Sequence, residues 1–443
     1  MCGFIITNKK DADLEHANFY IKLRGPDHTS IVEKNGVKFL HDLLSMTGYF
    51  TIQPFISNDI VCLYNGEIYN AFNFGDYKSD GECLIPLYKQ YGLDFTKKLD
   101  GEFAIVLFDF ANDIVILSTD VFATKPMWIA KDDESFCIAS YKSGAERLGF
   151  KDVQRFPTNK TLIMNTKMEE LDRYEVCSFS LNQHKEDFND WNVAFHNSIE
   201  KRCVKNVREN VFIGLSSGYD SGAIASELID QGIRFTAYTI MGQEDRYVMA
   251  ERKKYLNKHG CSIIIADSSK KPMARKYIDD FVEEYYYVTC CSRSNYNERH
   301  FEMHKDHGAS GISMISAMAK KGNKKIYLSG QGADEIFADY GFQGESKFEH
   351  SNFGGLFPED LETIFPWASF YESSQRSYLT KEEYIAGSYG LEARYPFLDK
   401  DVVQEFLWLS ANLKNKHYKN VLHNLMSQRR FPFHIGKKIG FLP

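Results

Sequence analysis

The chain has 443 residues, 43% of them hydrophobic and 14% aromatic, and this size and composition predict two, or at most three, folded domains. Its 53 basic and 60 acidic residues give a formal net charge of -7, which argues against binding to nucleic acid or to an anionic membrane surface. No apolar run reaches the roughly 18 residues of a membrane helix and the N-terminus lacks signal-peptide features, so we expect a cytoplasmic protein.

The N-terminal part of the chain contains short segments in which apolar residues alternate or run over strand length, separated by turns. These segments are 37–44, 59–69, 102–110, 113–120 and 135–140. They predict a sheet-rich N-terminal domain. A polar stretch follows around residue 183, and helical spacing of apolar residues begins at Trp191. We therefore expect two domains, with the ranges 2–180 and 186–443.

The second domain alternates strand-like and helix-like segments. Residues 210–230 contain a buried strand, a loop rich in Gly and Ser, and a helix. A helix-like segment at 248–260 lies between strand-like segments at 234–240 and 261–267. Residues 324–337 again consist of a strand, a loop and a helix. This alternation predicts a doubly wound parallel α/β sheet with helices on both faces.

Cys2 differs from the other eight cysteines by its position. Removal of Met1 would leave the α-amine of Cys2 beside its own thiol, and an amine that titrates at about pH 8 can act as base for this thiol. The other cysteines are scattered without CxxC spacing, so we expect reduced, mostly buried thiols. Four motifs accompany Cys2: RGPD (24–27), YNGEIYN (64–70), SDGE (79–82) and LDGEFA (99–104).

Together these motifs resemble the class II glutamine amidotransferases, which use an N-terminal nucleophile, over essentially the whole first domain. The resemblance implies an αββα sandwich of α+β type in which Cys2 attacks the amide of glutamine. It also implies that the Asn65 side chain and the Gly66 backbone NH form the oxyanion hole, because a tetrahedral oxyanion requires fixed donors. The glutamine-binding residues are then expected to be Asn65, Gly66, Glu67 and Asp80, with Asp80 receiving the ammonium group.

One segment departs from the pattern of this family. Members usually carry an HxRL segment whose arginine binds the carboxylate of glutamine, whereas this chain has HDLL at 41–44, with Leu43 at the arginine position. The missing guanidinium removes a bidentate, charge-assisted contact. His41 is a candidate replacement, but an ordinary histidine is mostly neutral at pH 7. We therefore expect weak binding of glutamine with the chemical step intact, and the sequence leaves open whether glutamine or free ammonia is the nitrogen donor.

The loop that follows the first strand of the second domain resembles the SGGxDS loop of ATP-pyrophosphatases. Ser217 replaces the usual second residue, a glycine. Backbone NH groups at a strand-to-helix turn can hold pyrophosphate, and the pattern differs from GxxxxGK[ST], so the resemblance implies cleavage between the α- and β-phosphates of ATP. The expected ligands of ATP and pyrophosphate are Leu215, Ser216, Ser217, Gly218, Tyr219, Asp220, Ser221, Ser329, Gly330 and Gln331.

A second loop, LSGQGADEIF at 328–337, resembles the LSGxGxDE segment of asparagine synthetases. Asp334 in this loop is the expected partner of Asp220 in binding Mg²⁺, because two carboxylates can bridge the metal to pyrophosphate oxygens. Gln331 departs from the pattern, since many members have an acidic residue at this position. The region 285–308 also lacks the TxxRA-type pattern expected for binding aspartate.

Two further segments complete the resemblance to asparagine synthetases. LEARYPFLD at 391–399 is a third family segment, in which we interpret Glu392 and Arg394 as structural. Lys419 aligns with the lysine that stabilises negative charge during adenylation and amide formation, so we expect it to be catalytic.

These resemblances predict a glutamine-dependent amidotransferase of the asparagine synthetase family. ATP, with Mg²⁺, would adenylate a carboxylate, and ammonia released from glutamine would displace AMP to give an amide. Aspartate is the default acceptor and another small carboxylate is the alternative. A lactam-forming ligase is a second alternative, against which the retained Cys2 and Asn65 argue, and a degenerate binding or regulatory protein is a third. We expect no nucleic acid or membrane partner, and the sequence leaves a homodimer open.

Overall fold

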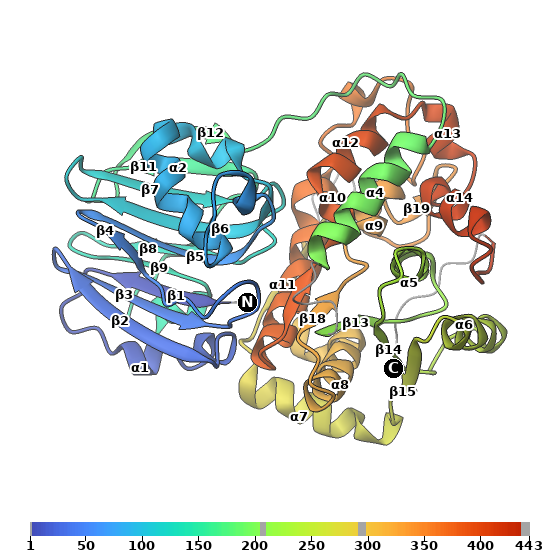
Figure 1. Ribbon diagram of the computed structural model, residues 1–443, viewed down its shortest axis with the longest axis horizontal. Helices are drawn as coiled ribbons and strands as arrows, with labels where there is room; N and C mark the ends of the chain where they lie inside the picture. Colours follow the sequence, from blue (N-terminus) through green and yellow to red (C-terminus); the bar gives the residue numbers. More distant parts are fainter. Residues whose placement is uncertain (1, 204–209, 291–297, 436–443) are drawn as a thin grey trace. The chain divides into compact units, whose positions relative to one another are not determined.

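The computed structural model describes residues 2–203, 210–290 and 298–435, with the side chains of 290 and 298–301 excepted (Figure 1). Its Cα positions divide the chain into two compact units. One comprises Met1–Ser178 with Gly387–Glu392, and the other comprises Phe179–Ala386 with Ala393–Pro443. In the described part of the chain, no helix is both long and apolar enough to cross a membrane.

The first unit is built on two six-stranded antiparallel sheets, with strand orders β10-β8-β9-β1-β3-β2 and β12-β11-β7-β6-β5-β4. The strands of the first sheet are β1 (Gly3–Thr7), β2 (His28–Lys34), β3 (Val37–Leu43), β8 (Trp128–Lys131), β9 (Phe136–Ala139) and β10 (Val153–Arg155). Those of the second are β4 (Phe55–Ser57), β5 (Ile60–Ile68), β6 (Gly101–Asp109), β7 (Ile114–Thr119), β11 (Lys160–Met164) and β12 (Glu170–Glu175).

Apolar side chains from both sheets form one core between them. Phe39 of β3 and Phe108 of β6 pack edge to face with ring centroids 5.4 Å apart, and Leu63 of β5 belongs to the same cluster. Alternate residues of β5, such as Tyr64, point instead into a second cluster that includes Leu87 of the helix α2. Strand β5 is therefore buried on both faces, which explains the apolar run over its residues 60–64.

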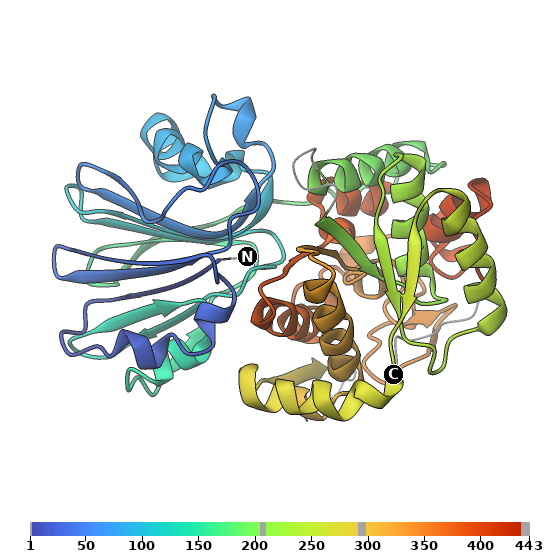
Figure 2. The same cartoon turned by 60° about the horizontal axis from the view of Figure 1, so that its bottom comes forward.

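Helices cover the outer faces of the two sheets. These helices are α1 (Leu14–Ala17) and α3 (Lys142–Glu146) beside the first sheet and α2 (Leu84–Tyr91) beside the second. Figures 1 and 2 show the two sheets stacked face to face between these helices. The αββα sandwich expected from the resemblance is confirmed, as are the five expected strands.

The second unit contains a five-stranded sheet with the order β15-β14-β13-β18-β21. Its strands are β13 (Val211–Gly214), β14 (Thr236–Thr239), β15 (Ser262–Ile265), β18 (Ile326–Leu328) and β21 (Glu392–Arg394). The pairs β13 with β14, β14 with β15, and β13 with β18 are parallel. The chain thus proceeds outward from β13 to β15 and then returns to the other side of β13, so the topological switch point lies between β13 and β18.

Helices connect and flank these strands. They are α4 (Asn189–Arg202), α5 (Tyr219–Asp230), α6 (Arg246–Lys258), α7 (Lys271–Phe281), α8 (His307–Lys321), α9 (Ala333–Phe337), α10 (Ala368–Tyr371), α11 (Ser373–Ser388), α12 (Lys400–Trp408), α13 (Ala411–Asn415) and α14 (Asn420–Gln428). Two hairpins, β16 (Tyr286–Cys290) with β17 (Glu298–Glu302) and β19 (Gly341–Phe342) with β20 (Glu345–Ser346), stand apart from the sheet. By the right-handed crossover rule, α5 and α6 cover one face and α8 the other, as the doubly wound prediction requires.

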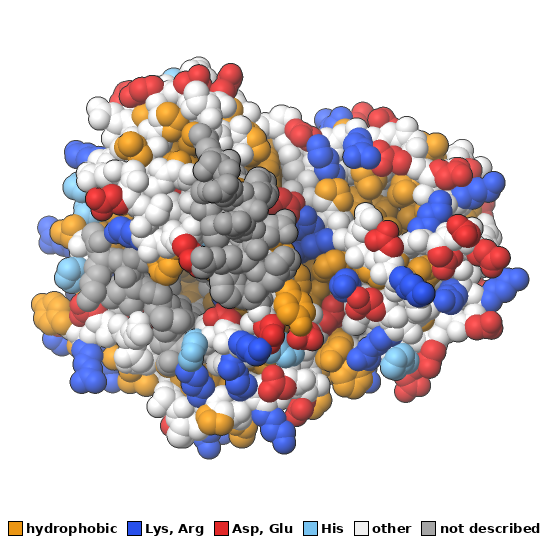
Figure 3. Space-filling view, turned by 180° about the vertical axis from the view of Figure 1, so that it is seen from behind, with side chains coloured by type: hydrophobic (Ala, Val, Ile, Leu, Met, Phe, Trp, Pro, Cys, Tyr) orange, Lys and Arg blue, Asp and Glu red, His pale blue; other side chains and the backbone are white. Residues whose placement is uncertain are grey.

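The surface charge agrees with the composition. Figure 3 shows Lys, Arg, Asp and Glu side chains interspersed over one face of the described residues, without a large area of a single sign.

Candidate functional sites

Cys2 lies at the start of β1, where contacts from three elements hold it. Its backbone N donates a hydrogen bond to Oδ1 of Asn65 in β5 (2.9 Å), and Nε of the buried Arg24 donates to its carbonyl oxygen (3.0 Å). Arg24 in turn donates to the hydroxyl of Tyr141 (2.9 Å). The arginine of the RGPD motif is thus a positioning residue for Cys2, a role that the sequence did not specify.

Asn65 has one amide atom engaged and the other available. Its Oδ1 accepts from Cys2, whereas its buried Nδ2 has no hydrogen-bond partner among the residues described. A buried donor without a partner costs free energy unless a ligand accepts from it. Neighbouring Gly66 has φ of +139°, and a Cβ there would lie 1.8 Å from the carbonyl oxygen of Glu102, so only glycine fits. These two positions agree with the expected oxyanion hole.

Two buried carboxylates lie near Cys2 in a small cavity. The Asp80 carboxylate accepts from the hydroxyl of Tyr64 (2.6 Å) and from the backbone N of Ile68 (2.8 Å). Glu67 accepts from the hydroxyl of Thr47 (2.9 Å). Burial and the adjacent Asp80 raise the pKa of Tyr64 well above its ordinary value, so Tyr64 remains a donor. The expected glutamine-binding residues Gly66, Glu67 and Asp80 therefore line one cavity with Cys2.

The thiol of Cys2 needs a base before it can attack. Burial raises its pKa to about 11, although the nearby N-terminal charge acts in the opposite direction. The thiol is consequently protonated at neutral pH, and among the described residues that line this cavity there is no histidine to deprotonate it. Activation by the α-amine of Cys2 itself, as expected from the sequence, agrees with this environment.

The same cavity has no cationic side chain among the described residues that line it, and Leu43 and Leu44 form part of its wall. Burial lowers the pKa of His41 to about 3, so this side chain is neutral, and it does not line the cavity. His41 therefore cannot replace the arginine that usually binds the carboxylate of glutamine. The wall contributes neutral donors instead, including Ser45, Thr47 and Thr51.

The second site lies at the topological switch point of the second unit. A cavity of about 260 Å³ opens there, between the loops that follow β13 and β18. Nine of the expected residues line it: Ser216, Gly218, Tyr219, Asp220, Ser221, Gly330, Gln331, Asp334 and Lys419. Leu215, Ser217 and Ser329 belong to the same loops but are not among the lining residues.

Lys419 joins the two carboxylates that we expect to bind Mg²⁺. Its Nζ lies 2.5 Å from Oδ1 of Asp220 and 2.7 Å from Oδ1 of Asp334, and the hydroxyl of Tyr418 donates to Asp334 (3.0 Å). Burial alone would lower the pKa of Lys419, but the two aspartates raise it above its ordinary value. Because Asp220 and Asp334 converge on one cation and both offer hard oxygen ligands, they fit a shared Mg²⁺.

Lys419 is also held in an unusual backbone conformation. As the N-cap residue of α14 it has φ of 48° and ψ of 56°, the left-handed region. A non-glycine residue in this region costs on the order of 1 kcal/mol or more, and such residues occur often at functional sites.

The loop after β13 is tied to the start of α6 through the serine that replaces the usual glycine. Both N and Oγ of Ser217 donate to the buried Glu244, and Oγ of Ser217 accepts from the backbone N of Asp245 (3.0 Å). Arg252 of α6 donates to the carbonyl oxygens of Ser216 and Gly218. Ser217 therefore fixes the loop to the start of α6 and does not line the cavity. Sequence analysis missed Arg252, which lies in a helical segment rich in charged residues.

Gln331 has a defined partner as well. Its Nε2 donates to Oε1 of Glu335 (2.8 Å), which also accepts from the hydroxyl of Tyr340. The other oxygen, Oε2, accepts from the backbone N of Gly332 (3.2 Å). The amide at position 331 thus stabilises a buried carboxylate that a second acidic residue would repel.

A larger cavity of about 920 Å³ adjoins the first. Gly308, Phe348, Tyr378 and Lys381 line both cavities. Its remaining wall consists of Tyr286, Tyr287, Thr289, Glu302, Lys305, Asp306, Lys347, Glu349 and His350. Lys381 donates to Asp306 (3.0 Å), and the rings of Tyr287 and Tyr378 pack edge to face, so the wall combines aromatic rings with charged side chains.

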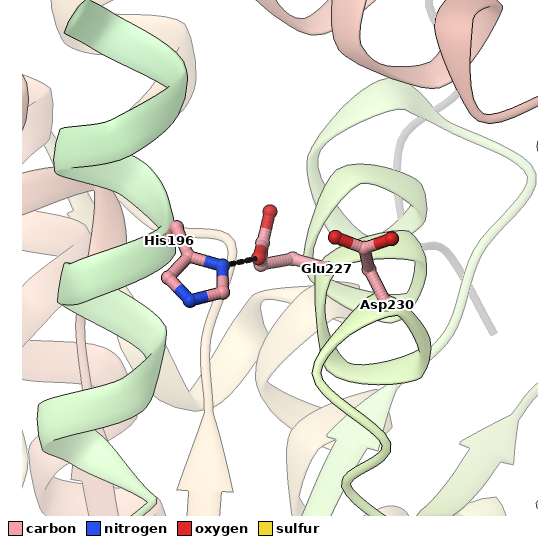
Figure 4. A group of neighbouring side chains, drawn as sticks. All are labelled: His196, Glu227 and Asp230. Atoms are coloured by element: carbon pink, nitrogen blue, oxygen red, sulfur yellow. Dashed lines mark hydrogen bonds and ion pairs between the residues drawn. The ribbon is translucent and has the colours of Figure 1, made fainter.

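Another cluster of possible metal ligands occurs among the described residues, and it contains neither of the expected Mg²⁺ ligands. Figure 4 shows His196 on α4 facing Glu227 on α5, with Asp230 one turn further along α5. Nδ1 of His196 lies 2.9 Å from Glu227, and Arg429 forms ion pairs with Glu227 (2.6 Å) and Asp230 (3.2 Å). The guanidinium already forms an ion pair with each carboxylate, so we interpret this cluster as a structural link between helices.

Comparison with known proteins agrees with both sites. Residues 1–174 match the family model described as a glutamine amidotransferase domain. The probable glutamine-hydrolysing asparagine synthetase of Schizosaccharomyces pombe is 25% identical over 454 residues, covering 95% of this chain and 78% of the relative. The putative glutamine-hydrolysing asparagine synthetase 1 of Methanocaldococcus jannaschii is 26% identical over 412 residues, covering 86% and 70%.

Likeness to solved structures is lower. A glutamine phosphoribosylpyrophosphate amidotransferase from B. subtilis is 13% identical, with 59% of this chain and 80% of that chain covered and a TM-score of 0.34. We draw no argument from this likeness.

The fold and the two sites define a class of protein, an N-terminal-nucleophile glutamine amidotransferase joined to a doubly wound domain with a pyrophosphate-type loop. Within this class, the chain is similar over most of its length to glutamine-hydrolysing asparagine synthetases, at 25–26% identity.

Proposed function

We propose that this chain hydrolyses glutamine in its first unit and uses the ammonia in its second unit to convert an adenylated carboxylate into an amide. The observation that carries this proposal is that one chain has two complete sets of reacting groups. Cys2 lies beside a buried, unpartnered amide donor, and Asp220, Asp334 and Lys419 meet at the switch point of the parallel sheet.

In the first reaction, the α-amine of Cys2 takes the proton of the thiol, and the sulfur attacks the amide carbon of glutamine. Nδ2 of Asn65 and the backbone NH of Gly66 donate to the oxyanion. Asp80 and Glu67 receive the ammonium group of the substrate. Ammonia leaves, and water hydrolyses the thioester to release glutamate.

In the second reaction, the acceptor carboxylate attacks the α-phosphorus of ATP and pyrophosphate leaves. The loop after β13 leads directly into α5, and backbone NH groups at the start of a helix can donate hydrogen bonds to pyrophosphate. Mg²⁺ held by Asp220 and Asp334 would neutralise charge on the phosphates. If Asp220 and Asp334 bind Mg²⁺, Lys419 loses its ion pairs with them. Its ammonium group could then donate hydrogen bonds to the adenylate.

Aspartate is the acceptor that we propose first, because the matching relatives are named asparagine synthetases. The test is to incubate the protein with ATP, Mg²⁺, aspartate and either glutamine or ammonium chloride. We expect pyrophosphate, AMP and asparagine with either nitrogen source. Glutamate should form only when glutamine is the nitrogen source. Absence of both glutamate and pyrophosphate under all these conditions would refute the proposed function.

One observation favours a second candidate, the same chemistry on a carboxylate that carries an aromatic or apolar body. The adjoining cavity of about 920 Å³ is much larger than aspartate requires, and Tyr286 and Phe348 in its wall are 48% and 44% exposed. ATP–pyrophosphate exchange should then be faster with 3-phenylpropionate than with aspartate, and Tyr286→Ala should reduce it. Tyr247→Ala, an exposed ring on α6 outside both cavities, is the matched control.

A further inference from the structure

Among the described residues that line the cavity at the switch point, the reactions above leave two carboxylates unused, Glu335 and Glu382. Both oxygens of Glu335 already accept hydrogen bonds, so Glu382 is the carboxylate of interest. It lies on α11, is 7% exposed, and lines the same cavity as Asp220, Asp334 and Lys419. Those three groups are paired with one another, whereas Oε2 of Glu382 is buried and has no hydrogen-bond partner among the residues described.

The other half of the Glu382 carboxylate is fixed in place. The hydroxyls of Ser329 and Tyr327, at the end of β18, form hydrogen bonds with Glu382. These bonds orient the carboxylate and leave Oε2 as its free acceptor. Buried carboxylate oxygens are nearly always satisfied, because an unsatisfied one costs roughly 1–3 kcal/mol, so an exception that lines a reaction cavity points to a functional role.

The residue at position 331 suggests a role for this free oxygen as a proton acceptor. Many members of the family have an acidic residue there, and a carboxylate beside the adenylate can accept a proton. A glutamine amide cannot, and Gln331 donates to Glu335, whose two oxygens are already engaged. The chain therefore needs a different proton acceptor near the adenylate, and Glu382 lines the same cavity as Gln331.

The surroundings of Glu382 suit proton exchange at neutral pH. Burial raises its pKa to about 7, while the hydrogen bond from Ser329 and the charge of Lys381 act in the opposite direction. A general base is most effective when its pKa lies near the working pH. The titratable groups that face Glu382 are Lys381 and Glu383 on the same helix, Glu335 on α9 and Tyr327 on β18.

We propose that Glu382 is the general base that takes the proton from nitrogen as ammonia attacks the acyl adenylate, an inference that rests on the proposed function. The lone pair of ammonia forms the new C–N bond, and the bond from carbon to the AMP oxygen breaks with its electron pair on AMP. One N–H proton passes to Oε2 of Glu382, which leaves a neutral amide. Glu382 returns this proton to water when the products leave.

The test separates adenylation from amide formation in Glu382→Gln, which keeps the shape of the side chain and an oxygen that can accept from Ser329 and Tyr327. With ATP, Mg²⁺ and aspartate, ATP–pyrophosphate exchange should stay within about threefold of the wild-type protein. Asparagine formation with ammonium chloride should fall on the order of 100-fold or more. Its matched control is Glu383→Gln, the adjacent buried carboxylate, which accepts from Tyr395 and does not line the cavity. We expect this control to keep the ratio of the two rates.

The pH dependence supplies a second readout. In the wild-type protein, kcat for asparagine formation, expressed per free ammonia, should rise through about pH 7 and level off above it, because the base must be deprotonated. Glu382→Gln should lose this rise, and Glu382→Asp should retain it with a lower plateau. Equal losses of exchange and of asparagine formation in Glu382→Gln would overturn the proposal, as would wild-type asparagine formation in that variant. If the wild-type protein itself catalysed no exchange, the proposed function would fail and this inference with it.

Discussion

Leu43 is the residue at which the glutaminase site departs most from the family pattern. It lies in the wall of the Cys2 cavity, and the described part of that wall has no lysine or arginine. The carboxylate of glutamine must then be bound by neutral donors such as Ser45 and Thr51, which are weaker partners than a guanidinium. A contact of this kind affects the ground state and the transition state equally.

The substitution Leu43→Arg should therefore lower KM for glutamine by about tenfold with little change in kcat. Asparagine formation from ammonium chloride should not change, because it bypasses this cavity. Ile31→Arg, an exposed residue of β2, is the control for an added positive charge. Steady-state glutaminase kinetics of the wild-type protein, Leu43→Arg and Ile31→Arg measure these effects on KM and kcat. The wild-type protein could instead have a KM for glutamine in the low micromolar range, and Leu43→Arg could raise it. This result would show that another group binds the carboxylate of glutamine.

Cys2 yields a prediction about chemical reactivity. Burial keeps its thiol protonated, so its reaction with an electrophilic glutamine analogue depends on the freed α-amine. We expect mass spectrometry of the labelled protein to find a mature chain that begins at Cys2 and carries a single label there. Asn65→Ala should reduce the rate of labelling without changing its site. Labelling of Cys62 or Cys83 instead would mean that the cavity around Cys2 does not admit the analogue.

Residues in motifs could be assigned from sequence, whereas residues recruited from helices could not. Cys2 and Lys419 were identified because their neighbours match a family pattern. Arg252 and Glu382 occur in helical segments rich in charged residues, and a charged residue there has the same sequence signature whether it is exposed or buried. Arg252 and Glu382 are recognised as buried only from the structure, in which α6 packs against the loop after β13 and α11 packs against β18.

At the level of elements, long buried strands were predictable and short ones were not. Strands β5 and β6 contain apolar runs at 60–64 and 103–108, which are long enough to predict strands from the local sequence. Strands β10 and β21 have three residues each, too few for a periodic signal, and their pairing depends on distant partners. The order of the strands in the second unit likewise depends on pairing between distant segments rather than on any local segment.

Asp399 illustrates how one side chain joins two helices, and it carries a stability prediction. It is the N-cap residue of α12 and forms ion pairs with Lys201 (2.5 Å) and Arg202 (2.8 Å) of α4. Burial alone would raise its pKa, but the two cations hold it at about 2, below the ordinary value of 3.8. Because the folded-state pKa is lowered, the stabilisation is complete above about pH 4 and is lost as the pH falls from about 4 to about 2.

Asp399→Asn should therefore destabilise the second unit by about 3 kcal/mol at pH 7, since it leaves buried cations without their partner. Urea denaturation at pH 7 and at about pH 2.5 measures the effect, and the difference from the wild-type protein should shrink at the lower pH. Asp360→Asn removes the charge of an exposed N-cap on the short helix at Leu361–Thr363 but keeps an oxygen that can accept the capping hydrogen bond, so it should cost no more than about 1 kcal/mol. Equal losses in the two variants would contradict the assignment of Asp399 as a buried link.

At the level of the whole molecule, the proposed function assigns different reactions, with separate groups, to the two units. The nucleophile, its amide donor and the ammonium-binding carboxylates belong to the first unit, and the nucleotide loop, the two aspartates and Lys419 belong to the second. Glutamine hydrolysis requires no phosphate or divalent cation, whereas adenylation requires both. Removal of one set of groups should therefore leave the chemistry of the other measurable.

The most direct test of this claim is to measure glutamate and pyrophosphate release side by side in Asp220→Asn and Asp334→Asn. We expect each substitution to abolish pyrophosphate release, because it removes a metal-binding carboxylate and one of the two partners of Lys419. Glutamate release from glutamine should remain measurable in both variants. Near-normal pyrophosphate release in either variant would contradict the account, because the two aspartates would then not form the centre at which ATP reacts.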